Sequence, residues 1–412
     1  MSYGISLGKV NYALLLFSDL NSFSENRLVN LTSAIRQINI RYNIKGDFNI
    51  LVDINATLYN DYLAPDKLKD YPSGLITIGG AGVQKRTRLL SVVSTERVVD
   101  PLTKFTTVQI EFAPYEYTRC PKFSRRIDGS VYDVLSHMYD SVFIDAYSSY
   151  KPSINTDGFS TSTKIYNLLQ RQSILDYCHE LRNNVISDNN LSPLFVWNTF
   201  GELNVSDLDS IIEQEPVDVI LKSTDVLNQF AAQNYTLPNG KPLYHATSYT
   251  SQVDFDVAKH EYAQNTMFFL PDVDSGNLNV LRNFSHEDIL AYQVIPAFGA
   301  NRDIAYLRAG AAKAISSNFR EALTSSMSTI TVYYPDVPFE PGVIINLKGT
   351  TEKPDVSIKY LVVETKIETN NSTGVQTITL VKLDTVLSLK ELYSDGNYLN
   401  MTQNKGPQNE KA

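Results

Sequence analysis

The sequence predicts an α+β fold in which two β-rich ends flank a middle region that contains helices. Runs of β-branched and aromatic residues, broken by Asn, Asp, Gly and Pro, occur near both ends of the chain, and helical spacing of apolar residues begins between them. The chain has 412 residues, of which 43% are hydrophobic and 20% are charged, so it is globular and too long for one ordinary core. We therefore expect two to four domains.

Residues 1–118 are expected to form an N-terminal β-domain. Six strand-like runs follow one another at near-even spacing, at residues 12–17, 35–44, 49–57, 75–78, 89–96 and 106–112. Such spacing is typical of a barrel or a sandwich. No internal repeat is obvious between this region and the C-terminal end of the sequence.

Residues 119–210 are expected to form a small α/β domain. Ser130–Tyr139 and Thr163–Leu181 place apolar residues at helical spacing. The stretch Leu194–Val205 then predicts a hairpin, with Gly201 in the turn at a position that needs a positive φ. Trp197 is the only tryptophan, and its large apolar surface is expected to anchor the hairpin against a helix.

The remaining residues predict a second β-domain, formed by 211–245 and 301–388, with an irregular insertion at 246–300. Strand-like runs lie at residues 328–334, 343–347, 360–367 and 376–383, and an apolar stripe predicts a long helix over 301–323. Phe339–Val343 predicts a turn that opens a strand. The polar tail, residues 389–412, is expected to be disordered.

Composition argues against tight nucleic-acid binding and membrane insertion. The net charge is −9, whereas a protein that grips phosphates usually carries a basic surface. No apolar run approaches the ~18 residues of a membrane-spanning helix, and the first residues lack a signal-peptide pattern. Two cysteines, Cys120 and Cys178, give no disulfide framework, which fits a reducing compartment such as a host cytoplasm.

We expect no metal, cofactor or phosphate site. Cys178 and His179 are adjacent, so on a helix they point about 100° apart, and no further ligands stand at metal-binding spacing. We interpret them as a core cysteine and a surface histidine. Gly79–Gly82 lacks both the P-loop ending and the GxGxxG spacing, and is interpreted as a loop between strands.

We also expect no catalytic residue. The carboxylate pairs Asp207/Asp209 and Glu213/Glu215 stand two residues apart in what we interpret as a hydrated loop, whereas a glycosidase needs two carboxyl groups that face each other across a substrate. A peptidoglycan hydrolase stays an alternative, as does a glycan- or receptor-binding module, which would bind sugars by tyrosine stacking. The 25 tyrosines are spread over the whole chain, however, and strands favour tyrosine.

Four segments in the order 24–57, 163–216, 301–325 and 339–383 resemble the central baseplate hub protein of contractile-tailed bacteriophages, a family related to the hub part of type VI secretion spike proteins. The shared features are a residue pair leading into a long strand, aromatic residues before a hairpin turn, a Gln-Glu-Pro end, and a Pro-Gly turn. The residues that carry the resemblance are Asn26, Arg27, Phe195, Trp197, Gly201, Gln214, Glu215, Pro216, Pro341 and Gly342.

This resemblance implies a structural virion protein that is not an enzyme. It implies a homotrimer whose chains each carry two β-barrel-like tube domains, with an α/β domain and an insertion between them. Three chains would adapt the six-fold tail tube to the three-fold spike and form part of the DNA conduit, without tight DNA binding. The implied partners are a spike or tail lysozyme protein below, tail tube or tube-initiator proteins above and wedge baseplate proteins around. The implied location is the virion tail baseplate, after assembly in the host cytoplasm.

Overall fold

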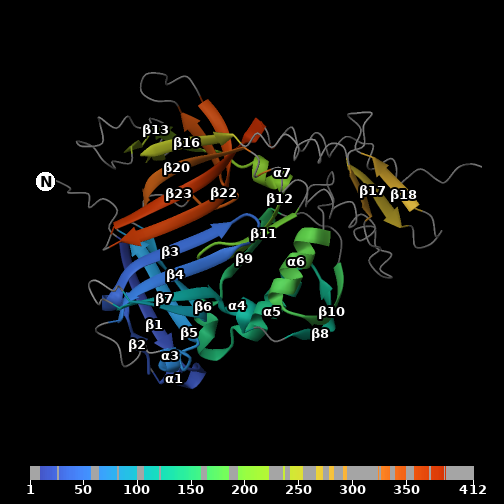
Figure 1. The fold of residues 1–412 in the computed structure, drawn as a ribbon. Helices are drawn as coiled ribbons and strands as arrows, with labels where there is room; N and C mark the ends of the chain where they lie inside the picture. Colours follow the sequence, from blue (N-terminus) through green and yellow to red (C-terminus); the bar gives the residue numbers. More distant parts are fainter. Residues whose placement is uncertain are drawn as a thin grey trace, which may run out of the picture.

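A computed structural model describes the chain at residues 10–25, 27–56, 65–80, 83–99, 106–119, 122–158, 165–184, 194–221, 235–236, 242–253, 266–271, 278–282, 291–294, 323, 326–334, 339–348, 357–370, 373–384 and 386. Within these residues the structure is mainly β, with a few helices (Figure 1). The long helix expected at 301–323 and the tail at 389–412 lie outside the described residues, except for Leu323.

The N-terminal sheet is antiparallel throughout. Its strands, in spatial order, are β3 (Ile35–Asn43), β4 (Phe48–Asn55), β7 (Thr106–Pro114), β6 (Val83–Val99), β5 (Ser73–Gly80), β1 (Val10–Phe17) and β2 (Val29–Asn30). Apolar residues alternate along β3, β4 and β7, so that one face of the sheet builds a core around residues such as Ile40, Ile50 and Ile110. The short elements α1 (Leu20–Ser24), η1 (Thr32–Ala34) and α3 (Pro65–Leu68) connect the strands.

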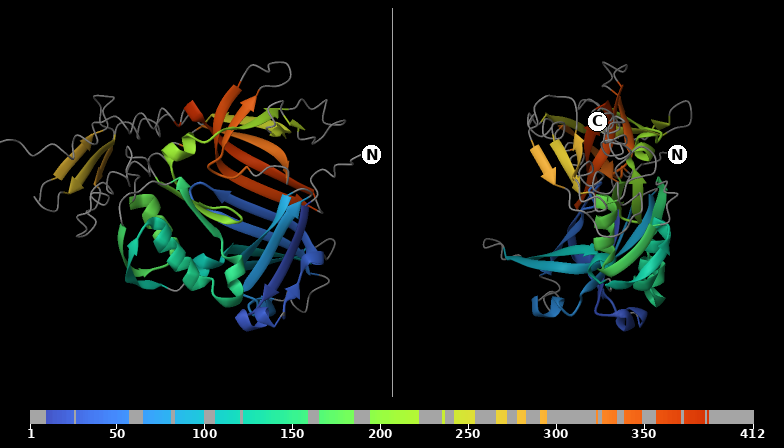
Figure 2. Two further views of the ribbon diagram at one scale, coloured as in Figure 1. Left: turned by 180° about the vertical axis from the view of Figure 1, so that it is seen from behind. Right: turned by 90° about the vertical axis from the view of Figure 1, so that its right-hand side faces the viewer.

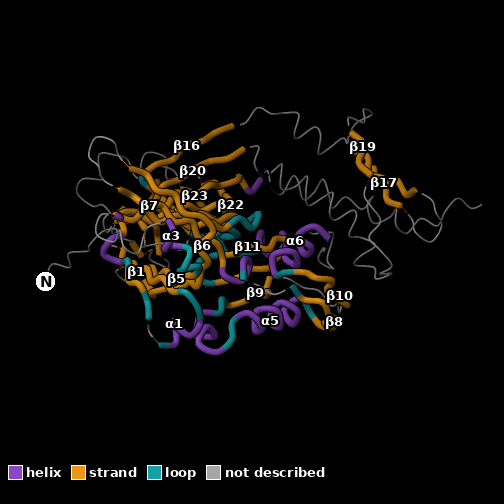
Figure 3. The backbone as a smooth tube through the Cα atoms, turned by 60° about the horizontal axis from the view of Figure 1, so that its bottom comes forward, coloured by secondary structure: helices purple, strands orange, loops and turns teal. Residues whose placement is uncertain are grey.

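The middle region gathers most of the helices beside two small sheets (Figure 3). One sheet pairs β8 (Phe123–Gly129) with β10 (Ile165–Gln172), and the other has the order β11 (Leu194–Asn198), β12 (Glu202–Asp207), β9 (Ser153–Gly158). The helices are α4 (Tyr115–Thr118), α5 (Val131–Val142), η3 (Asp145–Tyr150), α6 (Ile174–Asn184) and α7 (Leu208–Ile212). The apolar faces of α4, α5, η3 and α6 share one core with β11 and β12.

The prediction of one helix over Thr163–Leu181 is wrong. Its first part is strand β10, which pairs with β8, and only its second part is helical. The helix begins after Ser173 because Ser173 and Asp176 cap it reciprocally: Asp176 N–H donates to Ser173 Oγ at 3.1 Å, and Ser173 N–H donates to Asp176 Oδ2 at 2.9 Å.

The C-terminal sheet packs a third core. Its strands are β13 (Val217–Leu221), β14 (Tyr235–Thr236), β15 (Pro242–Ala246), β16 (Ser248–Val253), β20 (Ser326–Tyr334), β21 (Ile344–Lys348), β22 (Ser357–Asn370) and β23 (Thr373–Lys382). Part of the expected irregular insertion therefore belongs to this sheet, because β16 pairs with β20 along its full length. Three further strands of that stretch, β17 (Thr266–Pro271), β18 (Leu278–Arg282) and β19 (Ala291–Val294), form a sheet of their own.

The long strand β22 joins the N-terminal and C-terminal sheets into one. Its first part pairs with β21, its second part pairs with β3, and β23 runs along it from Tyr360 to Asn370. Figure 1 shows the blue strands continuing into the red ones at this contact. The strands of these two sheets thus form one continuous, branched open sheet that ends at β14, β2 and β16, and the described residues form no closed barrel.

The two sheets repeat one strand arrangement. The series β3, β4, β5, β6, β7 and the series β16, β20, β21, β22, β23 have the same chain order and the same antiparallel neighbours. A bulge occurs at the same place in both, after Val92 in β6 and after Val362 in β22. Val92 N–H donates to the carbonyl of Pro72, and Val362 N–H donates to that of Val343, each at 2.9 Å. The backbone thus carries an internal repeat that the sequence does not reveal.

Candidate functional site

A single turn, Phe339–Gly342, lies where the three cores meet. Gly342 has a φ of +89°, and a Cβ there would stand 2.7 Å from Cζ2 of Trp197. The indole of the middle region therefore packs directly on the turn that opens β21. Trp197 is 5% exposed, and its ring lies against this turn. Two residue groups that carry the family resemblance are thus brought together.

The turn is fixed to the C-terminal sheet through the carbonyl of Phe339. Gln376 Nε2 donates to it at 2.8 Å and Thr365 Oγ1 at 2.5 Å, and both side chains are buried. The Phe339 ring is fully buried and meets Tyr244 edge-on, with 5.5 Å between ring centroids. Two hydrogen bonds to one carbonyl hold the turn in place for the residues that follow it.

The same turn is tied to the N-terminal sheet by an ion pair. Arg86 of β6 donates to Glu340 Oε1 at 2.6 Å, and the Glu340 side chain is largely buried. Burial raises the pKa of Glu340, and the neighbouring Arg86 works against this rise. The hairpin turn beside it inserts Phe200 into the N-terminal core. The junction therefore joins all three cores by packing and by charge.

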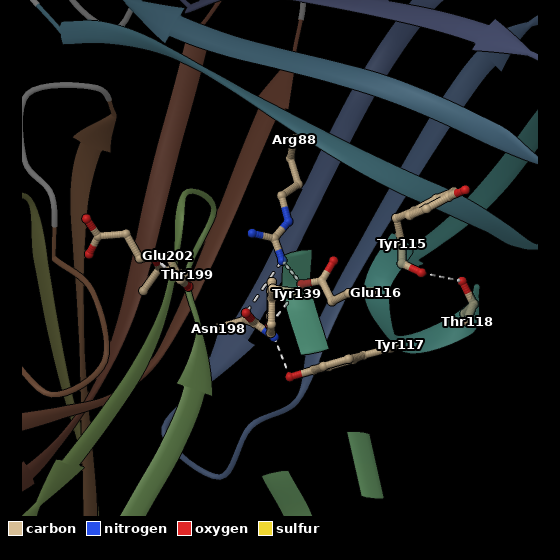
Figure 4. Close-up of polar contacts among 9 residues, drawn as sticks. All are labelled: Arg88, Tyr115, Glu116, Tyr117, Thr118, Tyr139, Asn198, Thr199 and Glu202. Atoms are coloured by element: carbon tan, nitrogen blue, oxygen red, sulfur yellow. Dashed lines mark hydrogen bonds and ion pairs between the residues drawn. The ribbon is translucent and has the colours of Figure 1, made fainter. Parts of the chain in front are cut away.

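A second polar cluster, largely buried, lies between the N-terminal sheet and the middle region (Figure 4). Arg88 of β6 forms an ion pair with Glu116 of α4, and their side chains are 1% and 0% exposed. Tyr139 Oη donates to Glu116 at 3.4 Å, and Arg88 donates to Asn198 Oδ1 at 3.5 Å. Asn198 in turn donates to the Tyr117 hydroxyl. The cluster links β6 with α4, α5 and β11.

Charge in this cluster is only partly compensated. Burial raises the pKa of Glu116, with Arg88 lowering it, and burial also raises the pKa values of Tyr117 and Tyr139. Arg88 Nε and Nη1 have no hydrogen-bond partner among the described residues, although the guanidinium carbon lies 5.6 Å from the centre of the Phe48 ring. Removing one partner would leave a buried charge without compensation, so the cluster ties the two cores together in a specific arrangement.

The other residues that carry the resemblance are placed apart from this junction or lie outside the described part. Arg27 is exposed and forms an ion pair with Glu25, whereas Asn26 is not described. Phe195 is fully buried in β11. Gln214 and Glu215 are exposed and Pro216 is half-buried, between α7 and β13. Pro341 is buried in the junction turn.

Gly201 does not have the positive φ that the hairpin turn was expected to need. The described glycines with a positive φ are Gly46, Gly129 and Gly342. The hairpin turn closes instead through Thr199 N–H, which donates to the Glu202 carbonyl at 2.8 Å. The Gly201 carbonyl accepts from Ser153 N–H at 3.2 Å, so its backbone continues the contact with β9.

The acidic stretch after the hairpin is helical at its start. Asp207 is 4% exposed and caps α7, since its Oδ1 accepts from Ser210 N–H at 2.8 Å. The interpretation as a hydrated loop is therefore wrong for Asp207, whereas Glu213 and Glu215 are exposed as expected. Cys178 is fully buried in the middle core, and His179 beside it is exposed.

No group of three metal-binding side chains occurs in the part of the chain that the structure describes. In the same residues, no helix has both the length and the apolar character needed to span a bilayer.

Sequence reasoning missed Arg86, Arg88, Glu116 and Glu340. Charged residues are normally placed on the surface, and the composition around Glu116 gives no contrary signal. Arg88 stands directly before the buried pair Leu89 and Leu90 in a strand-like run, which was a usable signal for a buried partner.

Comparison with known proteins finds a family to which the first half of the chain is similar. The family model described as baseplate structural protein, domain 1, matches residues 6–208. Comparison with curated protein sequences finds no match.

Solved structures of phage tail proteins share the fold. A tail protein from Neisseria meningitidis is 11% identical and has a TM-score of 0.54, and the match covers 93% of this chain and 99% of that one. The 43 kDa tail protein of prophage MuSo2 from Shewanella oneidensis is 11% identical with a TM-score of 0.52, covering 91% of this chain and 99% of that one. Residues 6–208 are thus similar to the first domain of phage baseplate structural proteins, and the fold of the chain is similar to that of phage tail proteins.

Proposed function

We propose that this baseplate protein is the central hub of a contractile phage tail, a homotrimer that adapts the six-fold tail tube to the three-fold spike. The observation that carries the proposal is the internal repeat: the series β3 to β7 has the same strand order as the series of β16 and β20 to β23, and β22 joins the two within one chain. Two similar units per chain would let three chains present six units to the tube, while the trimer as a whole keeps three-fold symmetry for the spike.

The sheet face opposite the N-terminal core is suited to the wall of a DNA conduit. Side chains on this face are polar and mostly engaged with one another: Arg41 donates to Glu364 at 2.9 Å, Gln109 donates to Asp53 at 2.9 Å, and Asn49 donates to Glu111 at 2.9 Å. Among the described residues of this face, few cations remain to bind phosphates, and each avoided phosphate contact lowers the retention of a passing genome.

Two further cations of the β-rich ends are also engaged by side chains of the same chain. Lys348 forms an ion pair with Asp218 at 3.0 Å, and Arg36 donates to Thr107 at 3.4 Å. Lys359, in contrast, is exposed. Contacts of this kind within the chain favour a neutral to acidic wall. A duplex-binding assay over a salt series tests this: we expect weak binding, and affinity that falls steeply with added salt would contradict it.

The proposed partners follow from the hub position. They are a spike or tail lysozyme protein below, tail tube or tube-initiator proteins above, and wedge baseplate proteins around, with DNA passing transiently. The proposed location is the virion tail baseplate, after assembly in the host cytoplasm.

Mass measurement tests the hub proposal. The full chain, alone and co-expressed with its spike protein, is analysed by light scattering after size exclusion, and antibody labelling locates it on virions. We expect three 46.3 kDa chains per particle, at least once the spike is present, and label at the baseplate. A stable monomer in the presence of the spike, or label elsewhere on the virion, would refute the proposal.

A further inference from the structure

Six hydroxyl side chains form a regular array on one face of the C-terminal sheet. The strands β16, β20 and β23 are neighbours in this sheet, and each contributes two residues to the face. Two rows cross the three strands, because each residue directly faces its partner in the next strand. The rows are Thr250, Thr329 and Thr379, and Ser248, Thr331 and Thr377. We call these six residues the hydroxyl array.

The hydroxyl array lies on the face that is proposed as the wall of the conduit. Its rows continue into Glu364 and Lys366 of β22, and Lys366 faces Arg41 of β3. The array and the polar side chains of the N-terminal sheet therefore belong to one face. The left-hand view of Figure 2 shows the C-terminal strands (orange and red) continuing from the blue strands of the N-terminal sheet. The opposite face of β20 and β23 carries buried residues such as Ile330 and Ile378.

Strand propensity alone does not explain the hydroxyl array. Threonine is common in strands, yet the N-terminal sheet has the same strand arrangement and fills the six equivalent positions differently. Those positions hold Gln37, Asn39, Leu51, Asp53, Gln109 and Glu111. There the polar groups bind one another: Gln37 donates to Asn39 at 3.0 Å, and Gln109 donates to Asp53 at 2.9 Å. The N-terminal sector of the wall is thus partly charged and internally bonded, whereas the hydroxyl array is uncharged.

The hydroxyl groups of the array are not engaged by other side chains. None of the six forms a hydrogen bond with another side chain among the described residues. Ser248 and Thr250 are exposed, and the four threonines on β20 and β23 are half-buried. By contrast, Thr77 and Thr87 face each other in β5 and β6 and share a hydrogen bond of 2.9 Å between their hydroxyl groups. A hydroxyl group both donates and accepts, so each member of the array keeps hydrogen-bonding capacity for a ligand.

The spacing of the hydroxyl array fits water as that ligand. Adjacent strands lie about 4.8 Å apart, and residues two apart along one strand are separated by about 6.6 Å. Two hydroxyl groups at the strand spacing are too far apart for a direct hydrogen bond, whereas one water that makes two bonds of about 2.8 Å spans about 4.6 Å. Each row can therefore hold a bridging water between every two neighbours.

We propose that the hydroxyl array binds an ordered layer of water on the wall of the conduit. The place of the array on this wall rests on the proposed hub function, whereas the water binding needs only one chain. A water layer carries no charge, so contact with it releases no counterions from phosphates. It also keeps the sector wet, whereas valines of the same shape would make an apolar wall from which water withdraws. Three copies would then alternate three hydrated sectors with three partly charged ones.

Removal of two facing hydroxyl groups tests the array. Thr329→Val with Thr379→Val keeps β-branched side chains on the strands, so the change is confined to the hydroxyl groups. The matched control is Thr77→Val with Thr87→Val, a facing pair whose hydroxyl groups bind each other and need no water. The unaltered chain and both variants are purified with the spike protein, and their structures are determined at a resolution that shows ordered water.

The outcomes separate the water site from the hub proposal. In the unaltered chain we expect an ordered water between each facing pair of the array, at hydrogen-bonding distance from both hydroxyl groups. The Thr329→Val, Thr379→Val variant should lose the waters of its own row and keep those between Ser248, Thr331 and Thr377, and the control variant should keep both rows. An array that lacks ordered water, or whose hydroxyl groups bind each other or a covering polypeptide, would overturn the inference and leave the hub intact. Bound water on an array that faces away from the axis of a trimer, or on a chain that stays a monomer, would overturn the conduit and leave the water site intact.

Discussion

Replacing Gly342 with alanine tests whether the junction turn requires a residue without a Cβ at this position. Two separate costs are expected. The backbone has a φ of +89°, which disfavours any residue with a Cβ by about 1–2 kcal/mol. The new Cβ would also stand 2.7 Å from Cζ2 and 3.1 Å from Cη2 of Trp197, a ring that is 5% exposed, so overpacking adds about 1–3 kcal/mol. The total loss in the free energy of unfolding is about 2–5 kcal/mol.

A double-mutant cycle separates the two costs. Trp197→Ala alone removes a buried indole and should cost about 3–5 kcal/mol. In that background, Gly342→Ala loses the clash and should cost only the backbone share, about 1–2 kcal/mol. Gly201→Ala is the matched control in the same junction, since its Cβ would meet no atom closer than Arg86 Cδ at 3.9 Å and its φ is not positive.

Urea unfolding followed by far-ultraviolet circular dichroism measures these differences, because fluorescence is lost with the only tryptophan. Gly201→Ala should change the free energy of unfolding by less than ~1 kcal/mol. The reasoning would be refuted by a Gly342→Ala cost that is the same with and without Trp197, or no larger than that of Gly201→Ala.

Three further predictions concern charge, a second glycine and catalysis. Burial raises the pKa of Glu116 in the folded chain, so the stability that this group contributes is present at low pH and is lost as pH rises through that pKa. Relative to Glu116→Gln, the wild type should lose stability in urea titrations as pH rises above the ordinary glutamate range, and a constant or rising difference would contradict this. Gly46→Ala, at a φ of +95° and against the Arg182 guanidinium, should lower the free energy of unfolding by about 1–2 kcal/mol, and an unchanged denaturation midpoint would count against it. The chain alone should not clear purified cell walls, and clearing that disappears in Glu213→Gln or Glu215→Gln would support the hydrolase alternative instead.

The sequence was sufficient for local structure at both ends of the chain. β-branched residues that alternate with polar ones predicted strands such as Ile35–Ile44 and Tyr360–Ile367, and the structure has β3 and β22 there. The stripe over Ser130–Tyr139 correctly predicted α5, whose capping box at Ser130 fixes its start. Local pattern failed at Thr163–Leu181, where pairing with β8 overrides the helical spacing.

Contacts between distant segments were not predictable in the same way. The repeat is hidden because equivalent positions hold different residues: Ile40 and Ile50 of one sheet correspond to Ser251 and Ser328 of the other. Backbone pairing preserves such a repeat without preserving its side chains. The family resemblance singled out Trp197 and Gly342 separately. Their contact was not predictable, because it depends on a fold that brings residues from distant segments together.

The pairing of β22 with β3 has a consequence during synthesis. Ile38 N–H donates to Thr369 Oγ1 across a sequence separation of 331 residues. At roughly 5–20 residues per second, the ribosome takes about 15–65 s to supply the strand that covers β3. During that interval the edge of β3 has no β22 of its own chain to pair with. A second nascent chain nearby offers the same β22, so two chains made from one message compete to exchange strands before each completes its own sheet. Slow translation and crowded polysomes should therefore favour swapped dimers, and separation of the chains should favour correctly folded monomers ready to assemble.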